Sequence, residues 1–193
     1  MDIPQDAPIV YVSFSAEINA STTESLIAVM SNCANKGVKK VYLLLSTPGG
    51  FTMNGLNLYN VLMGMPFELI IHNVGNVDSI GNAVFLAGTT RYATSSATFM
   101  FHGVAVGSEQ KQRLEEKDLR ERLANVLSDQ RRIGDIICRH TRISVGESEQ
   151  LFREAQTKDV SFAVEKGIIN EIRDVEIPPG SPIISLVFQR QGV

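Results

Sequence analysis

The chain has 193 residues with 18 basic and 21 acidic side chains, and the resulting net charge of −3 excludes a polycation that grips nucleic acid by its phosphates. With 44% hydrophobic and 20% charged residues it is not a disordered chain, and its length suits a single domain. Its two cysteines, Cys33 and Cys138, are too few for a disulfide scaffold or a metal cluster and fit a reducing compartment.

Short β-branched and aromatic runs alternate with helical patterns over the first hundred residues. In chain order they predict a strand at 9–14, a helix at 21–33, a strand at 41–45, a helix at 53–63, a strand at 67–74, a helix at 79–88, and strands at 89–94 and 97–102. The last two strands are close enough in the chain to be expected as neighbours in a sheet. The alternation predicts an α/β fold of βαβ units with a mostly parallel sheet.

A long charged segment follows at 108–140, without proline and without glycine until Gly134. Leucines and isoleucines recur in it at near-helical spacing. A helix of about 30 residues measures roughly 45 Å, more than a small domain, so we expect it to project or to pack on another subunit. The alternative is a solvated surface helix broken at Gly134.

The end of the chain predicts helices at 148–156 and 162–166, then a proline-rich linker and a strand at 183–188. We expect one domain over 1–176 and a tail over 177–193. The first residues are neither cationic nor apolar, and no apolar run approaches the ~20 residues that span a bilayer, so we expect a cytoplasmic protein without a signal peptide.

Ser79 stands between a predicted strand and a helix of small residues. Unpaired N–H groups at a helix start favour developing negative charge, which suits a nucleophilic serine. The same position suits a simple helix cap. The pattern is also not the Gly-x-Ser-x-Gly elbow, because Val77 occupies the first glycine position.

Two further motifs follow predicted strands. Gly49 and Gly50 allow a sharp turn whose N–H groups face a ligand, as an oxyanion hole requires, although a plain tight turn has the same sequence. His102 ends a buried strand, where it can act as a general base or remain a satisfied polar group. His72 and His140 have no serine at a comparable junction.

The order of these motifs resembles that of the Clp protease proteolytic subunit, from about residue 9 to residue 172. LLLSTPGGFTMNGLNLY resembles the family's Ser-Pro-Gly-Gly loop, and GNVDSIGNAVFLAGTTRYATSSATFMFHG resembles its nucleophile helix and the strands that lead to its histidine. AVEKGIINEI resembles the closing segment, with Lys166 and Asn170 as departures. The resemblance implies a ClpP/crotonase-like α/β fold of repeated βαβ units with a long projecting handle helix.

Residue by residue, the resemblance makes Ser79 the nucleophile and His102 its base. The oxyanion donors would be Gly49 and Ile80, and no metal or cofactor is implied. Residues that would flank an extended peptide bound by β-augmentation are Gly50, Phe51, Gly103, Val104 and Ala105. Residues 108–140 would be the handle that, in the family, joins two heptameric rings face to face.

Two departures qualify this assignment. The family's catalytic aspartate aligns with Ala155, so we expect Asp159, or alternatively Glu154, to serve His102; otherwise the site is a Ser–His dyad or inactive. Only about eight residues precede the first predicted strand, so we expect the family's axial loops to be missing, and with them the partnership with a Clp-type ATPase.

The function expected from the sequence is therefore a serine endopeptidase that cleaves short or unfolded polypeptides inside a homo-oligomeric chamber. A catalytically weak or inactive scaffold or regulatory homologue is the first alternative, and Ala155 supports it. A crotonase-type acyl-CoA enzyme is the second, but the loop offers no carboxylate pair, and the order of Ser79 and His102 would be unexplained.

Overall fold

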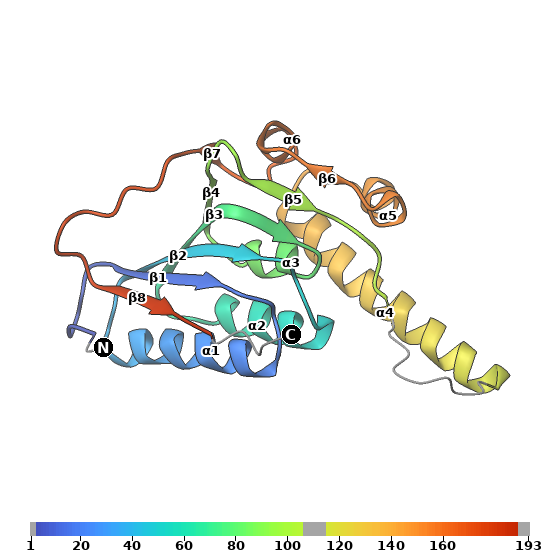
Figure 1. Ribbon diagram of the computed structural model, residues 1–193, viewed down its shortest axis with the longest axis horizontal. Helices are drawn as coiled ribbons and strands as arrows, with labels where there is room; N and C mark the ends of the chain where they lie inside the picture. Colours follow the sequence, from blue (N-terminus) through green and yellow to red (C-terminus); the bar gives the residue numbers. More distant parts are fainter. Residues whose placement is uncertain (1–2, 106–114, 189–193) are drawn as a thin grey trace.

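The computed structural model describes residues 3–105 and 115–188, which form one sheet with helices packed against it (Figure 1). The main strand order is β6-β5-β3-β2-β1-β8, with β4 paired to β3 and β7 paired to β4. The strands are β1 (Val10–Ser15), β2 (Lys40–Thr47), β3 (Glu68–Asp78), β4 (Thr90–Ala93), β5 (Thr98–Met100), β6 (Thr157–Lys158), β7 (Glu171–Ile172) and β8 (Ile183–Leu186). The helices are α1 (Ala20–Asn35), α2 (Thr52–Met63), α3 (Gly81–Phe85), α4 (Glu116–His140), α5 (Val145–Glu154) and α6 (Val160–Glu165).

The sheet is parallel except where β5 pairs with β6, as the strand–helix alternation predicts. The expectation that the two consecutive strands β4 and β5 are neighbours is wrong. Both pair with β3 instead, β4 along its first half from Ile70 and β5 along its second half from Asn76. β3 can accept both because it is longer than predicted and shifts register against β2 between Leu45 and Thr47.

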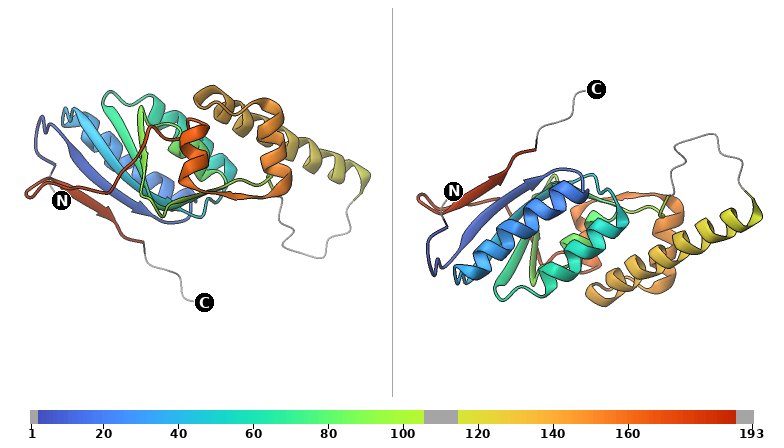
Figure 2. Two further views of the ribbon diagram at one scale, coloured as in Figure 1. Left: turned by 90° about the horizontal axis from the view of Figure 1, so that it is seen from above. Right: turned by 90° about the horizontal axis from the view of Figure 1, so that it is seen from below.

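The core lies between the sheet and the helices α1, α2 and α3, which lie on one side of it (Figure 1). Seen from below in Figure 2, α1 and α2 run side by side across β1, β2 and β3. Alternate strand residues such as Val12 and Leu43 are fully buried and belong to the same core cluster as Leu26 of α1 and Leu58 of α2. The parallel pairing of β2 with β3 places the carboxyl ends of both strands at one edge of the sheet.

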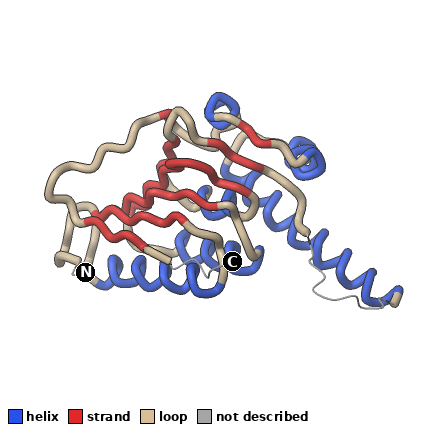
Figure 3. Tube along the Cα trace, viewed as in Figure 1, coloured by secondary structure: helices blue, strands red, loops and turns tan. Residues whose placement is uncertain are grey.

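Helix α4 projects well beyond the sheet (Figure 3). Only its C-terminal part is buried, through Ile133, Ile136 and Ile137. Towards its other end, Leu119, Leu123 and Leu127 are 55%, 58% and 55% exposed. The helix continues through Gly134, so the alternative of a surface helix broken there is wrong, and residues 108–114 of the predicted handle lie outside the described residues.

The C-terminal half also differs in its boundaries from the sequence prediction. α5 begins at Val145, three residues early, because Ser144 caps it in a reciprocal pair with Glu147. α6 begins at Val160 because the Asp159 side chain caps it. β8 adds to the free edge of β1, in parallel. In the described part of the chain, no helix is long and apolar enough to cross a membrane.

Candidate active site

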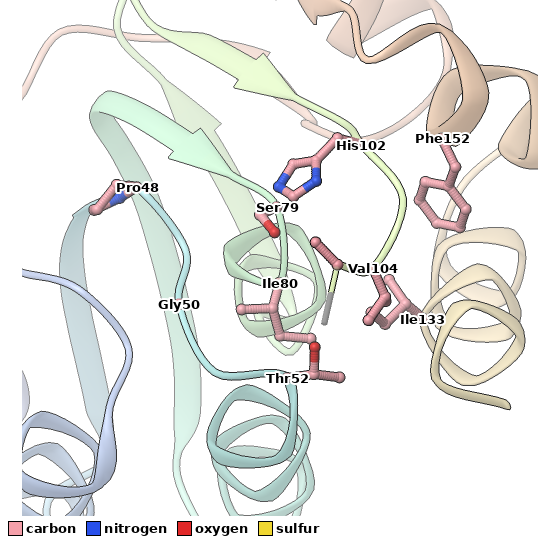
Figure 4. Close-up of a pocket in the computed structure, with 10 residues that line it drawn as sticks. Pro48, Gly50, Thr52, Ser79, Ile80, His102, Val104, Ile133 and Phe152 are labelled. Atoms are coloured by element: carbon pink, nitrogen blue, oxygen red, sulfur yellow. The ribbon is translucent and has the colours of Figure 1, made fainter. Parts of the chain in front are cut away.

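The candidate site lies where the carboxyl ends of β2, β3 and β5 meet (Figure 4). β2 and β3 are parallel neighbours, as are β3 and β5, so the segments that follow them emerge at the same edge of the sheet. They enclose a cavity of about 190 Å³ that contains both Ser79 and His102. Its remaining walls come from α2, α4 and α5, through Thr52, Ile133 and Phe152.

Ser79 sits in a tight turn between β3 and α3, with a left-handed backbone (φ +57°) that is unfavourable for residues with a side chain. Hydrogen bonds hold it there: its N–H donates to Met100 O at 2.8 Å, and its carbonyl accepts from Asn82 Nδ2 at 3.1 Å. The helix cap is Ile80, and Ser79 Oγ has no hydrogen-bond partner among the described residues. The Ser79 side chain therefore does not cap α3, and the simple cap interpretation does not apply.

The glycine loop after β2 lies against this turn. A Cβ on Gly49 would come within 2.7 Å of Ser79 Cβ, so only glycine lets the two backbones approach. A Cβ on Gly50 would collide with Ile18 O. Both glycines have positive φ, +86° and +147°. The Gly-Gly sequence is thus required by contact with the serine turn and with Ile18.

Pairing with Ile18 decides which N–H of the loop faces the cavity. Ile18 N–H donates to Gly49 O (2.7 Å), and Phe51 N–H donates to Ile18 O (2.8 Å). Because backbone groups alternate sides along an extended segment, the Gly50 N–H and C=O point the other way. The Gly49 N–H already donates to Thr47 Oγ1 at 3.1 Å. Gly50 is therefore the glycine with a backbone donor available to the cavity.

His102 lies beside Ser79, after β5 (Figure 4). Its Nδ1 is 2.7 Å from Gly103 O, which accepts a hydrogen bond if the proton is on Nδ1. In that tautomer Nε2 is the free base. The segment is fixed on both sides of the histidine, because Phe101 N–H donates to Gln156 O (3.1 Å) and Gly103 N–H to Phe152 O (2.9 Å).

The two candidate acids lie elsewhere. Asp159 Oδ1 accepts from Phe162 N–H at 2.9 Å as the cap of α6, and Glu154 accepts from Gln150 Nε2 at 2.8 Å. Neither lines the cavity. Ala155, at the aligned aspartate position, ends α5 in a left-handed conformation (φ +51°). The structure thus brings Ser79 and His102 together and leaves both carboxylates with other partners.

A polar network behind Ser79 was not predicted. Asn76 Nδ2 donates to Thr47 O (3.2 Å) and to Asp78 Oδ2 (2.6 Å), and Asn76 Oδ1 accepts from Ser46 Oγ (3.0 Å). It joins the base of the glycine loop to the end of the strand that carries Ser79. Asparagine in a strand gives no sequence signal for this role, because the network exists only across the β2–β3 register shift.

A family model of the Clp protease matches residues 9–176. The ATP-dependent Clp protease proteolytic subunit 2 of Chlamydia abortus is 28% identical over 127 residues. That alignment covers 61% of this chain and 62% of the relative, so it spans less than two thirds of the relative's length. The residues matched by the family model run from the start of β1 through the serine turn and His102 to the residues after β7. The chain belongs to the Clp protease family.

Proposed function

We propose that the protein is a serine peptidase that hydrolyses peptide bonds in short or unfolded polypeptides. The observation that carries this proposal is the convergence of three separate segments on one cavity. The unpartnered Ser79 hydroxyl, the His102 imidazole and the Gly50 N–H all line it, and no local sequence constraint forces them together. A nucleophile, a base and an oxyanion donor are the groups that acyl transfer requires.

The reaction follows from these positions. His102 Nε2 takes the proton from Ser79 Oγ as the oxygen attacks the substrate carbonyl. The oxyanion that forms accepts hydrogen bonds from the Gly50 and Ile80 N–H groups. His102 then gives its proton to the leaving amine, and the acyl-enzyme remains. The same imidazole then takes a proton from water as the water attacks the ester, and the resulting imidazolium protonates Ser79 Oγ as the acid product leaves.

An extended substrate fits between two backbone segments. The cavity-facing N–H and C=O of Gly50 offer one edge, next to the exposed Phe51 side chain. Val104 and Ala105 line the opposite side. Pairing through the backbone is indifferent to side chains, which suits unfolded polypeptides of varied sequence.

The third catalytic role is filled incompletely. Gly103 O can orient the His102 ring through Nδ1–H, but a neutral carbonyl stabilises the imidazolium less than a carboxylate does. Asp159 and Glu154 stay the candidate acids for a state in which residues 154–159 have moved. The structural arrangement supports a Ser–His pair of modest turnover.

Labelling with a fluorophosphonate probe tests the proposal. We expect Ser79→Ala to abolish labelling, since the probe reacts with an activated serine. Ser96→Ala is the matched control, because Ser96 is exposed on the β4–β5 turn, away from the cavity, and should leave labelling intact. Labelling that persists in Ser79→Ala would move the nucleophile elsewhere. Wild-type protein that does not react would favour the inactive scaffold, for which Ala155 is the supporting observation.

We also propose that the protein assembles into a homo-oligomer through α4. The row formed by Leu119, Leu123 and Leu127 is spaced four residues apart and is more than half exposed on each side chain. An apolar row of that length on a projecting helix is typical of an interface. Assembly would enclose the catalytic cavities in a chamber.

A further inference from the structure

The wall of the catalytic cavity opposite the glycine loop separates it from a second cavity. This second cavity, about 420 Å³, lies between α4 and α5. Phe152 lines both cavities. On α4, Ile133 lines the first and its neighbour Gly134 the second. The partition is therefore one side chain thick at Phe152.

The Phe152 ring lies beside position 134 of α4, where an added Cβ would come into ordinary van der Waals contact with it. A Cβ on Gly134 would lie 3.7 Å from Phe152 Cε2 and 3.4 Å from Ser148 Oγ. The ring hangs from α5 towards α4 in Figure 4, on the side of the cavity where Ile133 lies. The backbone carbonyl of Phe152 accepts a hydrogen bond from Gly103 N–H, which a substitution of the side chain preserves.

The catalytic cavity itself is apolar at this end. Val104, Ile133 and Phe152 line it, and apart from His102 none of its lining residues within the described chain is ionisable. The acyl-side substrate residue at the cleaved bond, P1, points into the space beside the nucleophile. Such a lining favours an uncharged, apolar P1 side chain, and the position of Phe152 limits how long that side chain can be.

We propose that Phe152 determines the P1 size limit of this peptidase by closing its P1 pocket off from the α4–α5 cavity. This inference rests on the proposed peptidase function. Removing the ring would join the two cavities, so that long side chains could pass between α4 and α5. Preference for a P1 residue would then move from leucine to tryptophan.

The experiment measures kcat/KM for fluorogenic peptides that differ only at P1, with valine, leucine, phenylalanine or tryptophan. Wild type should prefer valine and leucine. In Phe152→Ala the ratio of tryptophan to leucine should rise about tenfold or more, since filling or blocking a few methylenes of a pocket changes kcat/KM by 10–200-fold. Phe152→Leu should shift the ratio in the same direction by less, and covers the case in which the alanine variant does not fold.

Two controls test whether the change in the ratio comes from opening the wall between the two cavities at Phe152. Val145→Ala enlarges the second cavity from its outer rim without touching the catalytic one, and should leave the ratio unchanged. Adding Gly134→Ala to Phe152→Ala places a methyl group in the opening and should lower the ratio again.

An active Phe152→Ala with the wild-type ratio, or an equal shift in Val145→Ala, overturns the inference and leaves the peptidase proposal standing. Wild-type protein that cleaves none of the four peptides and resists the fluorophosphonate probe overturns both.

Discussion

The resemblance places the family's catalytic aspartate at Ala155, and the backbone at this residue makes the departure testable. It is left-handed (φ +51°), a conformation that aspartate and asparagine adopt more readily than alanine. The next residue, Gln156, bonds through its carbonyl to Phe101 N–H, directly before His102. We therefore expect Ala155→Asp to fold and to raise kcat about 10–10³-fold with little change in KM, because it supplies the missing charge for the imidazolium.

Ala155→Asn separates charge from shape in the same assay. Asparagine has nearly the same size and the same tolerance of left-handed backbone but no charge, so it should not raise kcat. Equal turnover in the wild type and both variants would mean that another carboxylate, Asp159 or Glu154, already serves His102 during catalysis.

At the residue scale the sequence predicts groups that follow strand ends, since a polar or glycine residue after an apolar run is visible locally. Ser79 and His102 were singled out in this way. The resemblance points to Gly49 as the donor, whereas the pairing of the loop with Ile18, which the local sequence does not show, leaves the N–H of Gly50 available. Phe152 was not singled out either, since an aromatic residue in a helix is typical of any core.

In helix α4, which the sequence predicts to project or to pack on another subunit, the leucine row is exposed in the structure. Charged substitutions on its exposed row, Leu119→Glu with Leu123→Glu, should lower the particle mass measured by sedimentation while circular dichroism remains unchanged. The fold should survive because both side chains are more than half exposed and lie far from the buried end of the helix at Ile137.

Ala124→Glu is the matched control for this helix. It is exposed and adds the same charge next to Leu123, but it lies about 100° around the helix from the leucine row. It should leave the particle mass nearly unchanged. If the wild-type protein sediments as a monomer, the proposed interface on α4 is ruled out, whatever the variants do.

Among the elements, the type was easier to predict than the extent or the partner. Periodicity identified the alternating strands and helices because the burial of one or two faces sets the spacing of apolar residues in each segment. It missed the second half of β3, where Gly75 and Asn76 interrupt the apolar run and the strand bends instead of ending. It could not tell that β4 and β5 share one partner, because pairing depends on a strand elsewhere in the chain.

On the scale of the whole molecule, the segments that follow strands of the sheet carry the candidate catalytic residues, and helices of the second half of the chain add walls to the candidate cavity. Ser79, Gly50 and His102 are fixed by β2, β3 and β5, whereas Ile133 and Phe152 come from α4 and α5. The sheet is held by a continuous core, and the second half of the chain joins it through the pairing of β6 with β5 and of β7 with β4 and through packing of α4 on α3. Changes in specificity are therefore expected in the second half, with the catalytic groups undisturbed.

The buried histidines make the stability of this fold depend on pH. His72 is fully buried: its Nδ1 is 2.9 Å from Tyr42 Oη, and its Nε2 has no partner among the described residues. Burial lowers the pKa of His72, and burial with the nearby Arg91 lowers the pKa of His140. Below the ordinary pKa of about 6.5, the unfolded chain therefore binds protons that the folded chain does not.

It follows that the free energy of unfolding is insensitive to these histidines above pH 7 and falls as the pH drops below 6.5. The slope contributed by His72 reaches at most about 1.4 kcal/mol per pH unit. Urea unfolding at pH 7.5, 6.5 and 5.5 should show this loss in the wild type, and His72→Phe should reduce it by removing the group that titrates. This pH range is separate from the one in which Glu147 titrates. The hydrogen bond with Lys166 is the main cause that holds the pKa of Glu147 at about 2, so its contribution to stability is lost only below pH 4.5. Parallel pH dependences for wild type and His72→Phe would show that the proton taken up on unfolding belongs to another group.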